Sequence, residues 1–438
     1  MVLLRSFRNV FHIPELMKKI YFTLGVLIVY RLGVFIPVVG VNIPMLAEYL
    51  QKAKTAGGLL SYLDMFSGGA LQQCTLFALG IGPYITASIM LQIMTKAVPQ
   101  LEQLSNEGDY GRRVINQYTR YVALGLSIVY ASGMAVFLES QGLVLTPGLG
   151  FKMLFVLSLT AGSMLVMWLG EQISLYGVGS SGSSLIIFSG IVARFPDYVL
   201  RTIEWVKIGK MSIVMALLIL AIFIAIAACI IFLEKGDRKI PVQYARRIIG
   251  QRVYGGQSTY IPFKINSTGV MPVIFAGTVM QIPLFLLSFL SARFEFFKSF
   301  SQSLAYNGFI FNVLQFGLIV FFTYFYTYLY FNPVELADNM KKNGGFIPGI
   351  RPGKQTADFF DYILVRIALV GAIYLGILAA LPNILSAIID MPFYLGGTSL
   401  LIVVGVALEL AAQIESYLIE HRYEGFLTSG SMKSRTIR

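Results

Sequence analysis

The stretch that decides the fold class is SIVMALLILAIFIAIAACIIFL, residues 212–233. It runs for 22 residues without a charged side chain, whereas ~20 apolar residues in a helix suffice to cross the ~30 Å hydrocarbon core of a bilayer. A helix that is apolar on every side is typical of a membrane span. The sequence therefore predicts an integral membrane protein.

Similar apolar stretches recur along the whole chain, of which 13% of the residues are charged and 56% hydrophobic. We predict ten spans, at residues 20–39, 75–95, 118–138, 152–170, 183–199, 212–233, 269–290, 308–331, 363–381 and 395–414. The fifth is the weakest, because its apolar part is short and follows the Gly/Ser-rich residues 177–184. Composition and spans together exclude a soluble enzyme.

The distribution of positive charge predicts the topology. The net charge is +12, and of the 34 Lys and Arg residues 24 fall on the termini and alternate loops of one face, against 9 on the other. Cytoplasmic loops carry the excess of Lys and Arg, so both termini are expected in the cytoplasm, and the first span, which lacks a cleavage pattern, is expected to be retained. The external loop with Arg194, Arg201, Lys207 and Lys210 runs against this bias.

No constellation of residues predicts catalysis or metal binding. The chain has two Cys and two His residues without metal-ligand spacing, and it lacks a P-loop, an HExxH pair and a G-x-S-x-G elbow. We expect no enzymatic activity, no cofactor and no metal. Arg31 lies within the first span, where it must face protein or water, and Glu409 in the tenth span is a candidate partner.

Two long cytoplasmic loops, 234–268 and 332–362, combine basic and aromatic residues. They fit either ordinary positive-inside charge or a docking surface for an acidic or RNA-bearing partner. A short apolar stretch, LLSYLDMF (59–66), lies between two Gly pairs. It is too short to cross the bilayer, so it fits either a static surface helix or a short helix that moves on its Gly joints.

Eight sequence blocks, in order, resemble one family. They are FSGGAL (66–71), FALGIGPYITASI (77–89), GRRVINQYTRY (111–121), WLGEQI (168–173), IIFSGIVA (186–193), PVQYARR (241–247), NPVELADNMKKNGGFIPGIRPG (332–353) and GGTSLLIVV (396–404). On these blocks the chain is identified as a member of the SecY/Sec61-alpha family of protein-conducting channels.

The resemblance implies a fold and a function. The fold is an all-α integral membrane protein with ten transmembrane helices in two pseudo-symmetric five-helix halves around a central pore, with a short plug helix. The implied divisions are a cytoplasmic N-terminus (1–19), an N-terminal half (20–199) with the plug at about 57–70, a C-terminal half (200–414) and a cytoplasmic tail (415–438). The implied function is passage of signal-bearing unfolded polypeptides across the membrane and sideways release of transmembrane segments into lipid.

The resemblance also implies site residues. An apolar ring at the waist of the pore comprises Ile81, Ile85, Ile187, Ile274 and Ile402. The sixth position falls at Ser183 or Ser184, since the chain reads YGVGSSGSSLIIF at this point. Either the ring has five apolar members here, or Leu185 fills the sixth position instead. The plug comprises Leu59, Leu60, Tyr62, Leu63, Met65 and Phe66. Polar candidates along the lateral gate are Thr86, Ser88, Gln92, Thr278 and Gln281.

The implied partners are the small membrane subunits SecE and SecG, the motor ATPase SecA, the ribosome, signal peptides with their nascent polypeptides, and the lipid bilayer; no specific DNA binding is expected. Basic residues that match the family's docking positions are Arg246, Arg247, Arg252 and Arg351. The implied location is the bacterial inner membrane or, alternatively, a thylakoid. A secondary solute transporter and a structural membrane scaffold are the competing functions, and a transporter would need more polar groups at mid-membrane than these spans offer.

Overall fold

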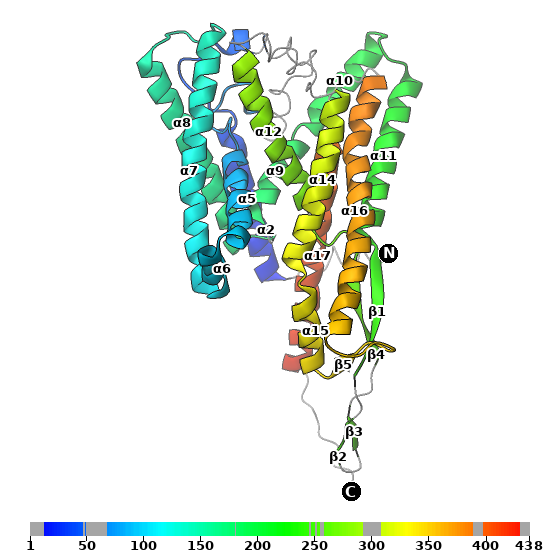
Figure 1. Cartoon of the computed structure of the whole chain (residues 1–438). Coiled ribbons are helices and arrows are strands. Elements are labelled where there is room, and N and C mark those ends of the chain that lie inside the picture. Colours follow the sequence, from blue (N-terminus) through cyan, green and yellow to red (C-terminus); the bar gives the residue numbers. More distant parts are fainter. Residues whose placement is uncertain are drawn as a thin grey trace. The chain divides into compact units, whose positions relative to one another are not determined.

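The computed structural model describes residues 13–46, 49, 68–179, 181–244, 247–249, 252–254, 258–291, 308–388 and 397–429. Helices dominate these parts of the chain (Figure 1). Seven helical stretches of the described residues are long and apolar enough to cross a membrane: Asp109–Ser140, Leu149–Tyr176, Gly182–Lys207, Ile213–Lys235, Ile310–Lys342, Lys354–Pro382 and Gly397–Glu420. The three other predicted spans also contain helices.

The helices occur in the predicted order. They are α2 (Pro14–Gly33), α5 (Gly82–Ala97), α6 (Pro99–Asn106), α7 (Asp109–Ser140), α8 (Leu149–Tyr176), α9 (Gly182–Val192), α10 (Phe195–Lys207), α11 (Ile213–Lys235), α12 (Met271–Ser291), α14 (Phe309–Tyr330), α15 (Pro333–Lys342), α16 (Lys354–Ile388) and α17 (Gly397–Ser429). A helix is therefore present at each of the ten predicted spans.

Two predicted spans differ from the structure in their bounds. The second was expected from residue 75, but α5 begins at Gly82, because Gly80 adopts a φ of +55° and residues 75–81 form turns. The fifth was expected to run to residue 199, but α9 ends at Val192 and α10 begins at Phe195. Pro196 lies in the first turn of α10, where its missing N–H is tolerated, and it cannot continue α9.

The chain forms two compact units. The first comprises Met1–Phe195 with Val406–Arg438, and the second comprises Pro196–Gly405. The helix α17 thus begins in the second unit and continues in the first. The two units are described separately below.

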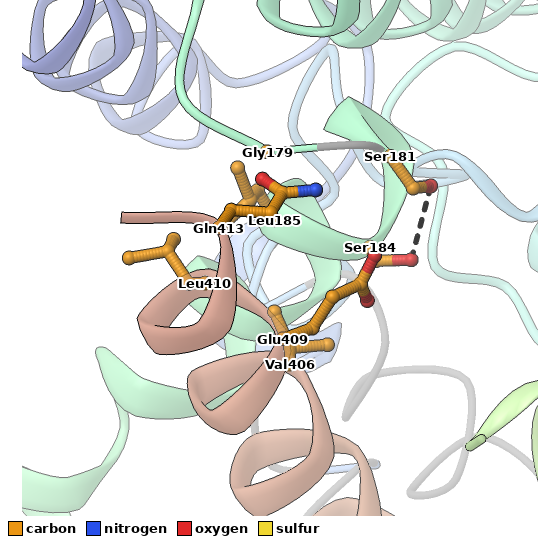
Figure 2. Close-up of a pocket in the computed structure, with 8 residues that line it drawn as sticks. All are labelled: Gly179, Ser181, Ser184, Leu185, Val406, Glu409, Leu410 and Gln413. Carbon is orange, nitrogen blue, oxygen red and sulfur yellow. Dashed lines mark hydrogen bonds between the residues drawn. The ribbon is translucent and has the colours of Figure 1, made fainter. Parts of the chain in front are cut away.

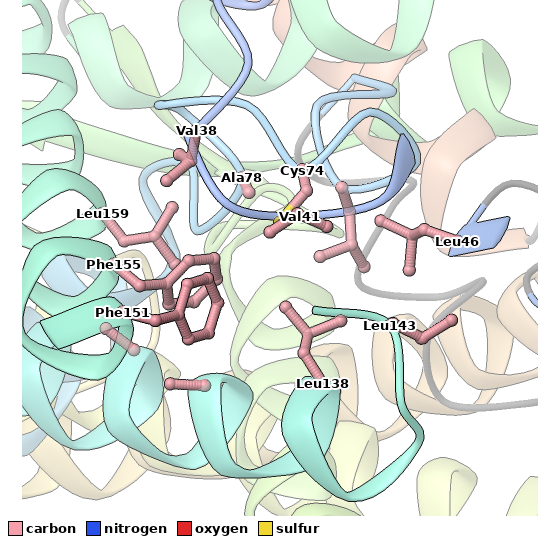
Figure 3. Close-up of a cluster of buried hydrophobic side chains, with 13 residues drawn as sticks. Val38, Val41, Leu46, Cys74, Ala78, Leu138, Leu143, Phe151, Phe155 and Leu159 are labelled. Atoms are coloured by element: carbon pink, nitrogen blue, oxygen red, sulfur yellow. The ribbon is translucent and has the colours of Figure 1, made fainter. Parts of the chain in front are cut away.

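The core of the first unit forms where α7 and α8 pack against the segments that follow α2 and precede α5 (Figure 3). The segments following α2 and preceding α5 are joined by backbone hydrogen bonds, with Val38 N donating to Cys74 O at 3.0 Å and Leu76 N to Ile36 O at 2.9 Å. The buried residues of this cluster are Val38, Val41, Leu46, Leu71, Cys74, Ala78, Ala131, Ala135, Leu138, Leu143, Phe151, Phe155 and Leu159.

The first and last of the helices that the structure describes also meet in this unit. Leu16 of α2 is buried against Val178 and against the apolar side of α17 that includes Leu410 and Ile414. Lys19 Nζ donates a hydrogen bond to the Tyr417 hydroxyl at 2.8 Å and lies 4.3 Å from the centre of its ring. These two residues are 398 positions apart in the sequence.

The second unit contains a sheet that the sequence analysis did not predict. Strands β1 (Asp237–Tyr244) and β4 (Ser258–Lys264) pair antiparallel, and β5 (Gly345–Phe346) pairs with the other edge of β1, giving the order β4-β1-β5. The register places Ile240 opposite Ile261. A smaller hairpin, β2 (Arg247–Ile249) with β3 (Arg252–Tyr254), lies between β1 and β4 in the chain.

This sheet is attached to the helices through a second apolar cluster. Phe263 of β4 lies 5.7 Å, centroid to centroid, from Phe360 of α16, and 6.0 Å from Phe331. Asn332 caps α15 by accepting hydrogen bonds from two backbone N–H groups of its first turn. The buried residues of the cluster are Ile240, Val242, Phe263, Ala337, Met340, Ile347, Ala357, Phe360, Ile363 and Leu364.

Candidate functional site

The structure brings two predicted ring residues of the first unit to one point. Ile81 is buried at the position that caps α5, and Ser183 lies in the first turn of α9. A Cβ placed on Gly170 of α8 would lie 3.3 Å from Ile81 Cδ1 and 3.5 Å from Ser183 N. Gly170 therefore lets the beginnings of α5 and α9 approach α8 together.

The remaining ring candidates of this unit follow one turn later on each helix. Ile85 is half-buried on α5, and Ile187 is buried on α9. Positions four apart share a helix face, so Ser183 and Ile187 lie on the same side of α9, as Ile81 and Ile85 do at the start of α5. The first unit thus holds two pairs of ring candidates on two helices whose first turns both lie beside Gly170 of α8.

Ser183 and Leu185 lie on different faces of α9. Leu185 is two residues from Ser183, which is about 200° around the helix. It faces the half of α17 that belongs to the first unit, where it helps to line a small hollow (Figure 2). The hollow is lined by Gly179, Ser181, Ser184, Leu185, Val406, Glu409, Leu410 and Gln413. Leu185 is therefore on a different face of α9 from Ile187.

Serine hydroxyl groups organise the entrance to α9. The hydroxyl oxygens of Ser181 and Ser183 are 3.0 Å apart, and Ser184 donates to Ser181 at 3.1 Å. The backbone N–H of Gly182 donates to Ser174 of α8 at 2.8 Å. Ser183 thus has a hydrogen-bond partner beside it, which lowers the cost of a polar side chain here.

The two ring candidates of the second unit are both buried. Ile274 lies in the first turn of α12, and Ile402 lies in the second turn of α17. Val270, just before α12, packs against Gly405 so closely that a Cβ on Gly405 would overlap the valine side chain. Convergence of all six residues on one pore stays a prediction.

The plug residues Leu59, Leu60, Tyr62, Leu63, Met65 and Phe66 lie outside the described residues. The described chain resumes at Gly68, whose φ is +64° and whose carbonyl oxygen accepts a hydrogen bond from Arg31 Nη1 at 3.3 Å. Arg31 Nη2 donates to Ser189 O at 3.4 Å. Arg31 is therefore held by backbone carbonyls at the last turn of α9, whereas Glu409, its candidate partner, lies with residues of the first turn.

The polar candidates for the lateral gate make hydrogen bonds within their own helices. Thr86 donates to Gly82 O at 3.1 Å, Gln92 to the Ser88 hydroxyl at 3.2 Å, and Thr278 to Ile274 O at 2.9 Å. The side chain of Gln281 lies outside the described residues. These contacts satisfy polar groups in a span at little cost and do not by themselves indicate a gate.

The docking candidates lie around the sheet of the second unit. Arg351 is exposed in the turn between β5 and α16, where its carbonyl oxygen accepts a hydrogen bond from Thr356 at 2.9 Å. Arg247 and Arg252 belong to the β2–β3 hairpin and pair with Tyr254 and Ile249; only their backbone is described. Arg246 lies outside the described residues. Both long loops are thus mounted on the buried cluster around Phe360.

Comparisons with known proteins decide the family. The SecY family profile matches residues 75–411. Protein translocase subunit SecY of Aquifex aeolicus is 43% identical over 427 residues, which is 96% of this chain and 98% of that protein. The chain belongs to the SecY family. The family prediction made from the eight sequence blocks is confirmed.

Solved structures share the fold of this SecY-family chain. One, described as the structure of a protein conducting channel, superposes with a TM-score of 0.63 at 18% identity and covers 92% of this chain and 93% of its own. Another, Sec61 in a canine ribosome-channel complex, gives a TM-score of 0.59 at 17% identity, with 92% and 93% covered. The all-α, ten-helix architecture agrees with these neighbours.

Sequence reasoning missed one pair of residues in two of the family's blocks. Arg120 of α7 forms a bidentate ion pair with Glu171 of α8, with Nε–Oε1 and Nη2–Oε2 distances of 2.9 and 2.8 Å. The two residues are 51 positions apart, and no local pattern links them. Among the described residues no group of acidic, His and Cys side chains could hold a metal ion.

Proposed function

We propose that this chain is the channel-forming subunit of a Sec protein translocase. It passes signal-bearing unfolded polypeptides across the membrane and releases transmembrane segments sideways into lipid. The observation that carries the proposal is the match to a protein translocase subunit SecY over 96% of this chain and 98% of that protein.

The apolar side chains on α5 and α9 support a passive pore. Ile81 and Ile187 are each nearly fully buried within the first unit, and Ile85 is half-buried beside them. An apolar constriction excludes ions because water leaves it, while flexible side chains can part around a passing polypeptide. We assign the sixth ring position to Ser183, because it shares a helix face with Ile187 and Leu185 does not.

The exposed Arg351 and the β2–β3 hairpin are proposed to receive the partner that drives transport, SecA or the ribosome. Arg forms planar, bidentate contacts with carboxylate or phosphate, so the same residue suits a protein or an RNA surface. The buried cluster around Phe263 and Phe360 supports this proposal, because it would hold the loops in place when force is applied. SecE and SecG are proposed as membrane partners, and the bacterial inner membrane, with both termini cytoplasmic, as the location.

Reconstituted translocation tests the proposal. Vesicles containing the full chain, a SecE-type subunit, SecA and ATP receive a preprotein, and a signal-deleted preprotein is the control. We expect ATP-dependent protection of the intact preprotein from protease and no protection of the control. Absence of protection, with SecA binding demonstrated, would contradict the channel function.

Two matched variants test the proposal that Arg351 receives the driving partner. Arg351→Glu is compared with Lys354→Glu, because both residues are basic, exposed and three positions apart in the second unit. We expect Arg351→Glu to abolish SecA-dependent protection and Lys354→Glu to retain most of it. Equal effects of the two variants would show that general charge, and not Arg351, governs docking.

A further inference from the structure

Helix α10 and the residues that follow it carry positive charge on the side of the membrane that is predicted to be external. The predicted external loop contains Arg201, Lys207 and Lys210, all exposed, and among the described residues none of the three forms an ion pair. Two acidic residues, Asp197 and Glu204, are exposed on the same helix. The stretch from 201 to 210 therefore keeps a net charge of +2. External positive charge needs a reason, because Lys and Arg are otherwise concentrated on the cytoplasmic side.

The same helix is amphipathic. Val199, Ile203 and Val206 follow the i, i+4, i+7 spacing that places side chains on one face. Val199 is 56% exposed and Ile203 is 45% exposed, so the second unit leaves much of this face uncovered. A helix with an apolar face and a basic end is the kind that lies at a membrane–water interface.

The composition of α10 also places it at the surface of the bilayer. α9 ends at Val192, and α10 begins as a separate helix at Phe195. Four of the 13 residues of α10 are charged, namely Asp197, Arg201, Glu204 and Lys207. A charge at nearly every turn is costly in the hydrocarbon core but suits the headgroup level.

An aromatic residue also places the last turn of α10 at the headgroup level of the bilayer. Lys210 Nζ lies 5.6 Å from the centre of the Trp205 ring. Trp is enriched at the headgroup level of membranes, where its ring is half apolar and its N–H reaches water. Trp205 and Lys207 lie within the last three residues of α10, and Lys210 follows three residues later.

We propose that the segment 201–210 binds the anionic headgroups of phospholipids in the external leaflet. Arg201, Lys207 and Lys210 supply the positive charge, and the apolar face of α10 reaches the acyl chains. The interaction anchors the second unit at its external surface. It requires a membrane span but not a translocation activity, so it can fail or succeed independently of the proposed function.

The chain offers its own reporters, because it contains two Trp residues. Trp168→Phe leaves Trp205 as the sole Trp in the full chain, and Trp205→Phe leaves Trp168, which is 53% exposed on α8 in the first unit. Each variant is reconstituted in vesicles in which a fixed fraction of either phosphatidylglycerol or phosphatidylcholine carries brominated chains. Bromine quenches Trp fluorescence on contact, so the quenching ratio measures the local preference for the anionic lipid.

We expect brominated phosphatidylglycerol to quench Trp205 about two- to fivefold more effectively than brominated phosphatidylcholine, the range that a charge worth ~1 kcal/mol at a membrane surface gives. The Lys207→Gln/Lys210→Gln double variant should remove the preference, and Lys207→Arg/Lys210→Arg should keep it. Trp168 quenching should not respond to either pair. Added NaCl should reduce the preference of Trp205 in the chain with both lysines, a test that needs no lysine variant.

Two results would overturn the proposal. Equal quenching of Trp205 by the two brominated lipids, or a preference that survives Lys207→Gln/Lys210→Gln, would show that the lysines do not select anionic headgroups. Absence of quenching by any lipid would place Trp205 away from the bilayer and favour an acidic polypeptide as the occupant.

Discussion

Near the ring candidates, the backbone at the start of α9 lies in close contact with the backbone of α8, and this contact leads to a testable prediction. Gly182, the first residue of α9, lies so close to α8 that a Cβ would overlap the Gly170 carbonyl oxygen and come within 2.9 Å of Ile173 Cβ. Neither obstacle is the flexible end of a side chain. Gly182→Ala therefore forces the start of α9 away from α8, and Ser183 moves with it.

The magnitude follows from two costs. Overpacking of this kind destabilises by about 1–3 kcal/mol, and displacement weakens the hydrogen bond from Gly182 N to Ser174, worth about 1 kcal/mol. The matched control is Gly125→Ala in the interior of α7, where a Cβ meets nothing within 4 Å. Replacing a glycine by alanine within a helix stabilises by about 0.5–1 kcal/mol. The two variants should therefore differ by about 2–5 kcal/mol.

Thermal unfolding of the full-length chain in detergent measures this difference. At 2–4 °C for each kcal/mol, Gly182→Ala should unfold at least about 4 °C below Gly125→Ala at the same heating rate. Resting ion conductance in planar bilayers should rise for Gly182→Ala alone, because the collar loses its fit at Ser183. Midpoints within about 1 °C of each other would refute the contact between α8 and α9 on which the reasoning depends.

Three further predictions concern other parts of the chain. In a double-mutant cycle, Arg120→Gln and Glu171→Gln should show a coupling of about 0.5–1 kcal/mol, since the pair is bidentate but half-exposed, and additive effects in chemical unfolding would contradict it. Ile402→Asn should raise resting ion conductance several-fold in planar bilayers by hydrating an apolar constriction, and unchanged conductance would count against Ile402 as a ring residue. Phe360→Ala should cost about 3–5 kcal/mol and expose the β1–β4 sheet to limited proteolysis, while Phe359→Ala, which is half-buried, should have a smaller effect; equal sensitivity would argue against a buried cluster at Phe360.

The ten spans could be predicted because hydropathy reports contact with lipid. The bounds could not, because helices continue beyond the hydrocarbon core. α7 begins at Asp109 instead of residue 118, and α16 begins at Lys354 instead of 363. The polar first turns of these helices carry no apolar signal. In the second span the reverse holds, since residues 75–81 are apolar but form turns around Gly80.

The sheet of the second unit could have been predicted from the alternation of residues in β1 and β4. In β1, Ile240 and Val242 are buried while their neighbours are exposed, and Ile261 and Phe263 alternate in the same way in β4. This period of two is typical of a strand with one covered face. The positive charge of the loop favoured its interpretation as a docking surface instead of as a strand.

The site could be predicted only in part. The ring candidates came from the family's sequence blocks, and they stay predictions as a set. The choice between Ser183 and Leu185 stays a prediction, because a sequence with an insertion does not fix which residue faces the collar; the structure adds that the two residues lie on different faces of α9. The pair of Arg120 and Glu171 lay beyond sequence reasoning, since only packing of α7 on α8 joins them.

The contact between Lys19 and Tyr417 has a consequence for biosynthesis. Helix α2 packs on α17, and Lys19 and Tyr417 are 398 residues apart, while ribosomes add about 5–20 residues each second. The face of α2 with Leu16 and Lys19 therefore waits on the order of 20–80 s for α17 to be made. A chain truncated before residue 410 would leave this face of α2 without its partner.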